Sequence, residues 1–230
     1  MIEFLFIDLD DTVLDFHMAE QVALSKTLRF FGLEPDEQVI ARYSQINREH
    51  WERLERKELT REEVLVGRFQ VLFREYGLTV DPVQCARTYE GNLSQGHYFL
   101  PGAREAVESL SKKYRLYLAS NGTARVQAGR LESANISHFF EKIFVSQEMG
   151  ANKPDILYFQ RCFAQIPDFD LQKAMIVGDS LSSDILGGIQ AGMKTCWVNP
   201  TGKPCREDVR PDYEIQSIAQ LEALLETLST

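Results

Sequence analysis

The sequence of 230 residues contains no apolar run near the roughly 20 residues that a transmembrane helix needs. Its start, Met1-Ile2-Glu3, has no basic segment ahead of an apolar one, so we expect no signal peptide and a cytoplasmic protein. Basic residues are fewer than acidic ones: the chain has 25 Lys and Arg and 34 Asp and Glu, which gives a formal net charge of -9. We therefore expect neither nucleic-acid polymers nor membranes among its partners.

Cysteine is also scarce, with four thiols and no Cys-x-x-Cys pair. In a chain of this length, such spacing favours reduced cytosolic cysteines over a disulfide framework. The four histidines show no ligand spacing with these cysteines, so zinc is not expected. A GxxxxGK[ST] loop is missing too, which argues against an ATP-dependent P-loop kinase.

Apolar residues make up 44% of the chain, enough for a packed core. From Phe16 to Tyr98 the chain is charged and helical in pattern, whereas from Leu100 onward apolar strands alternate with helices. That alternation is typical of βαβ units and a parallel sheet. The predicted strands cover 4–7, 114–120, 143–145, 174–178, 195–198 and 213–215. The predicted helices cover 18–31, 36–57, 60–76, 82–92, 102–113, 124–133, 156–163, 182–191 and 218–228.

The first strand has no partner strand before residue 114, which indicates a helical unit inserted after it. We expect an α/β core of residues 1–15 and 99–230, with a Rossmann-like parallel sheet, and an all-α cap domain of residues 16–98. Both crossings lie near the candidate site described next, so we expect the insert to act as a lid. The alternative is that these helices only pack on one face of the sheet.

A group of acidic residues follows the first apolar strand, in Phe4-Leu5-Phe6-Ile7-Asp8-Leu9-Asp10-Asp11-Thr12. Burying such carboxylates together is costly without a counter-charge, and Mg²⁺ prefers oxygen ligands. Ligands of open α/β sheets bind beyond the carboxyl ends of the strands. The segment therefore predicts a metal-assisted active site, with a plain capping turn as the alternative.

Three later segments follow strands or precede helices in the same way. Ser120-Asn121-Gly122 ends a strand, and its hydroxyl and turn amides could hold a phosphate oxygen. Lys153 precedes Pro154, which we expect in the first turn of a helix. Gly178-Asp179-Ser180 ends another strand, and Asp184 falls in the next helix. Each segment alone also fits an ordinary turn or a surface lysine; together, in this order, they indicate one site.

The four segments resemble the haloacid dehalogenase superfamily of aspartate-nucleophile phosphohydrolases. Its pattern is a DxDx[TV] strand, a Ser or Thr strand end, a lysine before a helix and a GDxxxxD strand end. The insertion after the first strand is similar to the family's helical cap of the first type. Segments 183–192 and 195–199, with Gly67-Arg68-Phe69, resemble the pyrimidine 5′-nucleotidase-like branch.

The resemblance implies that Asp8 attacks phosphorus and becomes an aspartyl phosphate, while Asp10 protonates the leaving group and later activates water. It implies Mg²⁺ bound by the Asp8 carboxylate, the Asp10 backbone carbonyl and Asp179, with Asp184 steadying bound water. Thr12 would order the turn.

The resemblance further implies that Ser120 and the Asn121 amide grip phosphoryl oxygens, and that Lys153 bridges Asp8 and the phosphate. Asp10 argues against a dehalogenase and against a phosphonate hydrolase, which lack an acid at that place. A phosphomutase stays open.

The expected partner is a small phosphorylated metabolite, and the branch implies a pyrimidine nucleoside monophosphate. Sugar phosphates and other small phosphometabolites remain alternatives, and so does a phosphate-responsive binding or signalling module without turnover. The sequence leaves the oligomeric state open. Phe16 and Phe99 either stack a base or pack the cap on the core. The candidate substrate residues are Phe16, His17, Asn47 and Tyr98, with Phe99, Trp51 and Arg68 as weaker candidates.

Overall fold

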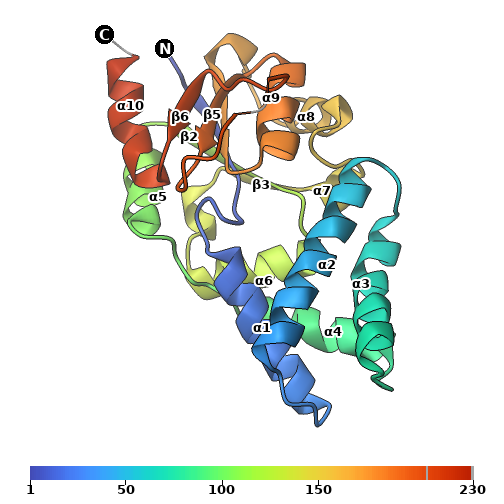
Figure 1. Cartoon of the computed structure of the whole chain (residues 1–230). Coiled ribbons are helices and arrows are strands. Elements are labelled where there is room, and N and C mark those ends of the chain that lie inside the picture. Colours follow the sequence, from blue (N-terminus) through green and yellow to red (C-terminus); the bar gives the residue numbers. More distant parts are fainter. Residues whose placement is uncertain (206, 229–230) are drawn as a thin grey trace.

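The apolar runs of the sequence form parallel strands, as the computed structural model of residues 1–205 and 207–228 shows (Figure 1). Within the described residues they make one six-stranded sheet of order β3-β2-β1-β4-β5-β6, in which every neighbouring pair is parallel. The sheet thus has β1 at its centre, next to β2 and β4. The strands are β1 (Phe4–Ile7), β2 (Arg115–Ser120), β3 (Lys142–Val145), β4 (Ala174–Gly178), β5 (Lys194–Val198) and β6 (Tyr213–Ile215).

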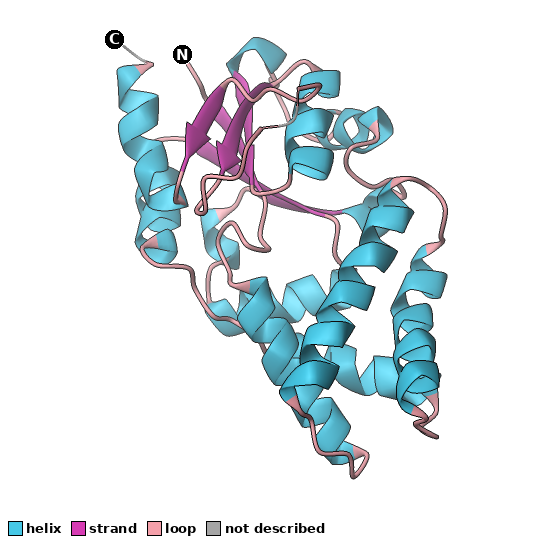
Figure 2. Cartoon of the chain, viewed as in Figure 1, coloured by secondary structure: helices cyan, strands magenta, loops and turns pink. Residues whose placement is uncertain are grey.

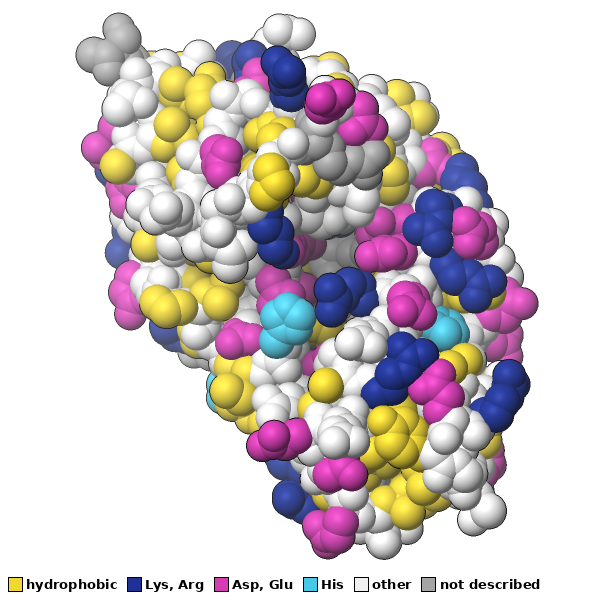
Figure 3. Space-filling model, in the orientation of Figure 1, with side chains coloured by type: hydrophobic (Ala, Val, Ile, Leu, Met, Phe, Trp, Pro, Cys, Tyr) yellow, Lys and Arg dark blue, Asp and Glu magenta, His cyan; other side chains and the backbone are white. Residues whose placement is uncertain are grey.

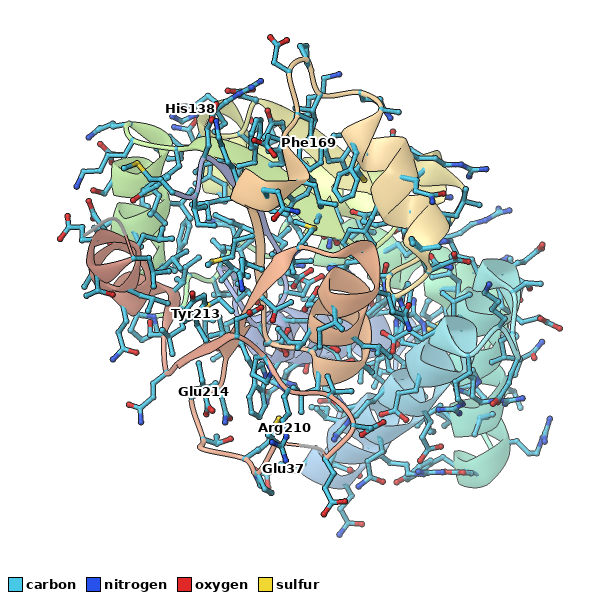
Figure 4. The ribbon with its side chains drawn as sticks, turned by 90° about the horizontal axis from the view of Figure 1, so that it is seen from above. Glu37, His138, Phe169, Arg210, Tyr213 and Glu214 are labelled. Atoms are coloured by element: carbon cyan, nitrogen blue, oxygen red, sulfur yellow. The ribbon has the colours of Figure 1, made fainter. Side chains whose placement is uncertain are left out.

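Helices cover both faces of this sheet (Figure 2). Alternate residues of a strand point to opposite sides, so β1 contributes apolar side chains to both faces. Leu5 and Ile7 pack in a cluster with α5, α6 and α10, whereas Phe4 and Phe6 pack in a second cluster with α8. Phe169, beside α8 in Figure 4, is packed against the second cluster. The helices of this part are α5 (Ala103–Ser111), α6 (Ala124–Ala134), α7 (Ser146–Met149), α8 (Ile156–Phe163), α9 (Leu186–Ala191) and α10 (Leu221–Thr227).

Four further helices follow β1 and form a bundle beside the sheet layer (Figure 1). Helix α1 packs on α4 and α2 packs on α3, around a shared hydrophobic cluster to which α6 adds Val126. The Thr60 capping box begins α3, and Gly77, with φ of 65°, ends it, both as predicted. The helices are α1 (Phe16–Phe30), α2 (Glu37–Glu55), α3 (Arg61–Tyr76) and α4 (Pro82–Leu93).

The chain crosses between the sheet and this bundle twice, and the two crossings lie side by side. The amide of Asp15 donates to the carbonyl of Tyr98 (2.8 Å), and that of Leu100 donates to Val13 (3.0 Å). Leu14 and Phe99 form an antiparallel bridge there. The chain thus passes between the sheet layer and the bundle through one narrow two-stranded connection.

The predicted α/β architecture is confirmed, with all six strands at their predicted places to within one residue. The prediction that Pro154 lies in the first turn of a helix is wrong. Helix α8 begins at Ile156, because the Asp155 side chain accepts from the Leu157 amide and caps it. The short helix α7 was not predicted. Among the described residues, none of the helices combines the length and apolarity that a bilayer crossing requires.

Candidate active site

A pocket of about 430 Å³ lies between the carboxyl ends of the central strands and the helical bundle. Residues that follow β1, β2 and β4 line one wall, and residues of α1, α2 and α3 line the other. In the space-filling view a hollow separates these two parts of the molecule, with acidic side chains around it (Figure 3). The sequence placed Asp8, Asn121, Lys153 and Asp179 at strand ends or before a helix, and all four line this one pocket.

Three carboxylates meet at the bottom of the pocket. Asp8, Asp179 and Asp184 each offer an oxygen atom, and these atoms lie within 4.8 Å of one another. The Nζ atom of Lys153, which is buried, lies 2.7 Å from Oδ1 of Asp8 and 2.5 Å from Oδ1 of Asp184. It also donates to the carbonyl of Ala119 (2.6 Å). One ammonium group therefore joins the ends of β1 and β2 to the corner after β4.

This group contains three carboxyl groups but only one ammonium group. Burial raises the pKa of Asp8 to about 8 even though Lys153 opposes the shift. Burial, and then the charges of Asp8 and Asp184, raise the pKa of Asp179 well above its usual range. Burial lowers the pKa of Lys153, but Asp184 and Asp8 outweigh it, so the ammonium stays charged. The buried carboxylates of Asp8 and Asp184 and the partly buried carboxylate of Asp179, with one ammonium group beside them, form an all-oxygen donor set that suits a hard divalent cation such as Mg²⁺.

Glycine at position 178 is required for this arrangement. A Cβ atom there would lie 2.2 Å from Oδ2 of Asp184, so only glycine lets that carboxylate approach the strand end. The same Oδ2 accepts from the amide of Ser180 (3.1 Å). Asp184 lies in the first turn of the helical segment Leu181–Ile185, in agreement with the prediction.

The loop after β2 is fixed to the segment that carries Lys153. The Asn121 side chain donates to the Lys153 carbonyl (2.9 Å) and accepts from the Lys153 amide (2.8 Å). Asn121 and Gly122 line the pocket, but Ser120 is not among its lining residues. Its hydroxyl is buried and accepts from Nε2 of Gln127 (2.7 Å) and from the amide of Gly122 (3.1 Å). The part of this loop that faces the pocket is therefore 121–123.

The carboxylate of Asp10 is held apart from the other three. It accepts from Nε2 of Gln127 (2.7 Å) and from the guanidinium of Arg130, both on α6. We did not predict either residue. The only available signal was a glutamine and an arginine three positions apart in a helix whose neighbours Val126 and Leu131 are apolar.

The bundle side of the pocket carries a buried polar network. Glu20 accepts from the Ser44 hydroxyl and from Nδ2 of Asn47 (2.7 Å), and Asn47 accepts from Nη1 of Arg68 (2.8 Å). Burial raises the pKa of Glu20, although Ser44 and Asn47 oppose the shift. Asn47, which we predicted as a substrate residue, therefore lies in a network of charged and neutral groups that faces the three carboxylates across the pocket.

Of the aromatic and histidine candidates, Phe16 and His17 line the pocket. Tyr98 is not among the lining residues, so its selection as a substrate residue finds no support in this pocket and stays a prediction. Its backbone pairs with Asp15 at the crossing, the residue is 40% exposed, and its ring stacks on that of His97. Trp51 and Arg68, the weaker candidates, also line the pocket.

Comparisons with known proteins identify the family of this chain. The sequence model of the family described as haloacid dehalogenase-like hydrolase matches residues 5–198. The chain is 37% identical to the HAD-hydrolase YfnB of Bacillus subtilis, over 98% of this chain and 96% of that protein. It is 36% identical to the pyrimidine 5′-nucleotidase PynA of Streptococcus pneumoniae, over 95% and 93% of the two chains.

A third relative, the pyrimidine 5′-nucleotidase YjjG of Escherichia coli, is 26% identical over 97% of both chains. Among solved structures, the fold is similar to a crystal structure of Bacillus subtilis YfnB bound to magnesium, described as revealing interdomain movement. The TM-score is 0.93 at 37% identity, over 97% of this chain and 98% of the other.

Proposed function

The chain belongs to the haloacid dehalogenase-like hydrolase family and is a phosphohydrolase, and we propose that it is a Mg²⁺-dependent pyrimidine 5′-nucleotidase that works through an aspartyl phosphate. The observation that carries the chemistry is the position of Lys153 Nζ between Asp8 and Asp184, in a group of three carboxylates of which these two are buried. The likeness to PynA and YjjG, both named pyrimidine 5′-nucleotidases, supports the substrate class.

In the first step, an oxygen of the Asp8 carboxylate attacks phosphorus in line with the ester oxygen. A new bond forms between that oxygen and phosphorus, the ester bond breaks, and Asp10 gives its proton to the leaving alkoxide. Lys153 lies against Asp8 and is placed to offset the charge that develops on the phosphoryl oxygens. The backbone of the loop with Asn121 holds those oxygens.

In the second step, water attacks the phosphorus of the aspartyl phosphate and Asp10 takes its proton. The bond to Asp8 then breaks, which releases inorganic phosphate and restores the carboxylate. Asp10 thus alternates between acid and base, so its carboxyl group has to turn toward the substrate. In this structure Gln127 and Arg130 hold it at the wall of the pocket.

The donor set fits Mg²⁺, and we propose that Asp8, Asp179 and the Asp10 backbone carbonyl bind it, with Asp184 beside them. When bound, Mg²⁺ supplies positive charge that lets Asp8 stay ionised and that compensates the charge of the phosphoryl group. Its presence would reverse the raised pKa of Asp8, because the desolvated carboxylate would then have a divalent counter-charge.

We propose that residues 16–98 act as the cap domain and close over the bound substrate, as expected from the sequence. Their helices share a hydrophobic cluster to which the core adds Val126, and the chain passes between the two parts at one narrow crossing. The pocket between the two parts holds the buried network of Glu20, Asn47 and Arg68 on the cap side. We propose that this side contacts the nucleoside.

The test is phosphate release from a panel of phosphomonoesters with Mg²⁺. The panel contains UMP, CMP and dTMP, the purine nucleotides AMP and GMP, glucose 6-phosphate, and p-nitrophenyl phosphate as a general substrate. We expect kcat/KM for the pyrimidine nucleotides to exceed the others by about tenfold or more, or about 1.4 kcal/mol of discrimination. A sugar phosphate as the best substrate would reject the nucleotidase assignment, and stable phosphorylation without release would indicate a signalling module. An Asp8→Asn preparation controls for contaminating phosphatases.

A further inference from the structure

Arg61, the first residue of α3, reaches out of the cap and binds the core. Its Nη1 atom donates to the carbonyls of Asn121 (3.0 Å) and Gly122 (2.9 Å). Its Nη2 atom donates to Oγ of Ser146 (2.6 Å) and to Oδ1 of Asn152 (2.6 Å). These four contacts join one side chain of the cap to three separate segments of the core.

Two of the three segments that Arg61 joins bear on the phosphoryl group. Asn121 and Gly122 form the loop after β2 that lines the pocket. Asn152 directly precedes Lys153, and the side chain of Asn121 is bonded to the Lys153 backbone in both directions. The guanidinium therefore fixes the spacing between the phosphate loop and the lysine without touching the pocket floor itself.

The chemistry of these contacts needs a guanidinium. All four acceptors are carbonyl, hydroxyl or amide oxygens, and a planar fork of donors can reach them at once, whereas an ammonium group acts as a single point. Burial lowers the pKa of Arg61 to about 10, so the side chain remains charged at neutral pH. The ring of Trp51, from α2, lies 5.5 Å from the guanidinium carbon and supports it from the cap side.

A neighbouring cap–core contact provides a comparison. Nζ of Lys57 lies 2.7 Å from the carboxylate of Asp155, but the Lys57 side chain is 75% exposed. An exposed pair of this kind contributes little to the position of a loop. Arg61, in contrast, is partly buried between the two parts and binds backbone carbonyls of the site.

We propose that Arg61 is a positioning residue that couples cap closure to phosphate binding. When the cap closes, the Arg61 side chain holds the Asn121–Gly122 loop and the Asn152–Lys153 segment at the spacing that binds a phosphoryl group. The proposal rests on the proposed phosphohydrolase function. It predicts that the open form, in which Arg61 is withdrawn, binds a phosphoryl group weakly. The cap would then be part of phosphate recognition as well as of substrate choice.

The test compares Arg61→Ala and Arg61→Lys with the control Lys57→Ala in the full chain. Hydrolysis of p-nitrophenyl phosphate gives kcat and KM, and inhibition by inorganic phosphate gives a Ki that reports phosphate binding alone.

For Arg61→Ala we expect KM and Ki to rise at least about tenfold, with partial recovery on adding guanidinium ion. Arg61→Lys should recover only part of the loss, and Lys57→Ala should stay within about twofold of the unmodified protein. Equal effects of Arg61→Ala and Lys57→Ala, or full activity of Arg61→Lys, would overturn the proposal.

Hydrogen exchange separates this proposal from the proposed function, because it needs no turnover. Deuterium uptake by the amides of 119–124 and 150–155 should increase in Arg61→Ala and not in Lys57→Ala, while uptake by β1 and β4 stays the same. Unchanged uptake in both segments would overturn the positioning role whatever the enzyme hydrolyses. If the unmodified protein cleaves no phosphomonoester but the exchange result holds, the proposed function fails and the coupling of cap and loop stands.

Discussion

The buried guanidinium of Arg130 donates a hydrogen bond to the carboxylate of Asp10, across 120 positions of sequence. Its Nε atom also donates to the carbonyl of Gly96 (3.0 Å), where the chain returns from the bundle to the core. One side chain thus contacts both Asp10, the residue proposed as acid and base, and Gly96, at the end of the bundle beside the crossing. The orientation of Asp10 is therefore tied to the position of the cap connection.

Replacing this arginine should affect catalysis more than substrate binding. In Arg130→Met, Asp10 loses a partner that orients it, so we expect kcat to fall about 10- to 100-fold with a smaller change in KM. The melting temperature should also fall, because the buried contact with Gly96 is lost. The control is Arg125→Met, an exposed arginine on the same helix. An equal loss of kcat in the control would contradict the role of Arg130.

Asp8→Asn should abolish turnover while the fold persists. The amide keeps the size of the side chain but cannot form the covalent bond, so we expect a loss of at least about 10⁴-fold in kcat. The fold should persist because the change removes a buried charge, one whose pKa is already raised to about 8 by burial. Circular dichroism and phosphate release measure the two effects. Near-native turnover would exclude Asp8 as the nucleophile.

Magnesium should stabilise the protein through the carboxylate cluster. An ion at 100 times its Kd adds about 2.7 kcal/mol to the free energy of unfolding, which is several degrees in melting temperature for a chain of this size. In Asp179→Asn this shift should disappear. The metal-free variant should be at least as stable as the metal-free unmodified protein, because one of three mutually repelling carboxylates is gone. Thermal melting in EDTA and in Mg²⁺ measures both, and an unchanged shift would argue against ligation by Asp179.

A methyl group at position 178 should disrupt the same cluster. The Cβ of Gly178→Ala would lie 2.2 Å from Oδ2 of Asp184, so the carboxylate has to move away from the strand end. We expect loss of the magnesium-dependent melting shift and of most of the activity. Gly91→Ala, in α4, is the matched control, because a Cβ there has no atom within 4 Å. That variant should be neutral or more stable by about 0.5–1 kcal/mol. If Gly178→Ala binds magnesium as tightly as the parent, the close approach is not required.

The sequence predicted the sheet and the groups at its carboxyl edge for a simple physical reason. Parallel strands buried on both faces appear as apolar runs, and the residues that follow neighbouring strands necessarily meet at one edge. That argument placed Asp8, Asn121 and Asp179 in one pocket, and Lys153 with them.

The residues that were not predicted act through contacts that no local pattern reveals. Gln127 and Arg130 occupy ordinary helix positions, and their role depends on α6 lying beside Asp10. Arg61 contacts Asn121 and Asn152, which are 60 and 91 positions away. Tyr98 was selected because it lies near the crossing, but sequence position alone does not determine to which side a ring turns.

The central claim, that Asp8 accepts the phosphoryl group, is tested most directly by trapping the intermediate. The unmodified protein is mixed with p-nitrophenyl phosphate and Mg²⁺, quenched in acid during turnover, digested and analysed by mass spectrometry. The account predicts a phosphoryl group on the peptide that contains Asp8, removed by hydroxylamine as expected of an acyl phosphate. A phosphoryl group on a different peptide, or none while nitrophenol is released at the full rate, would contradict it.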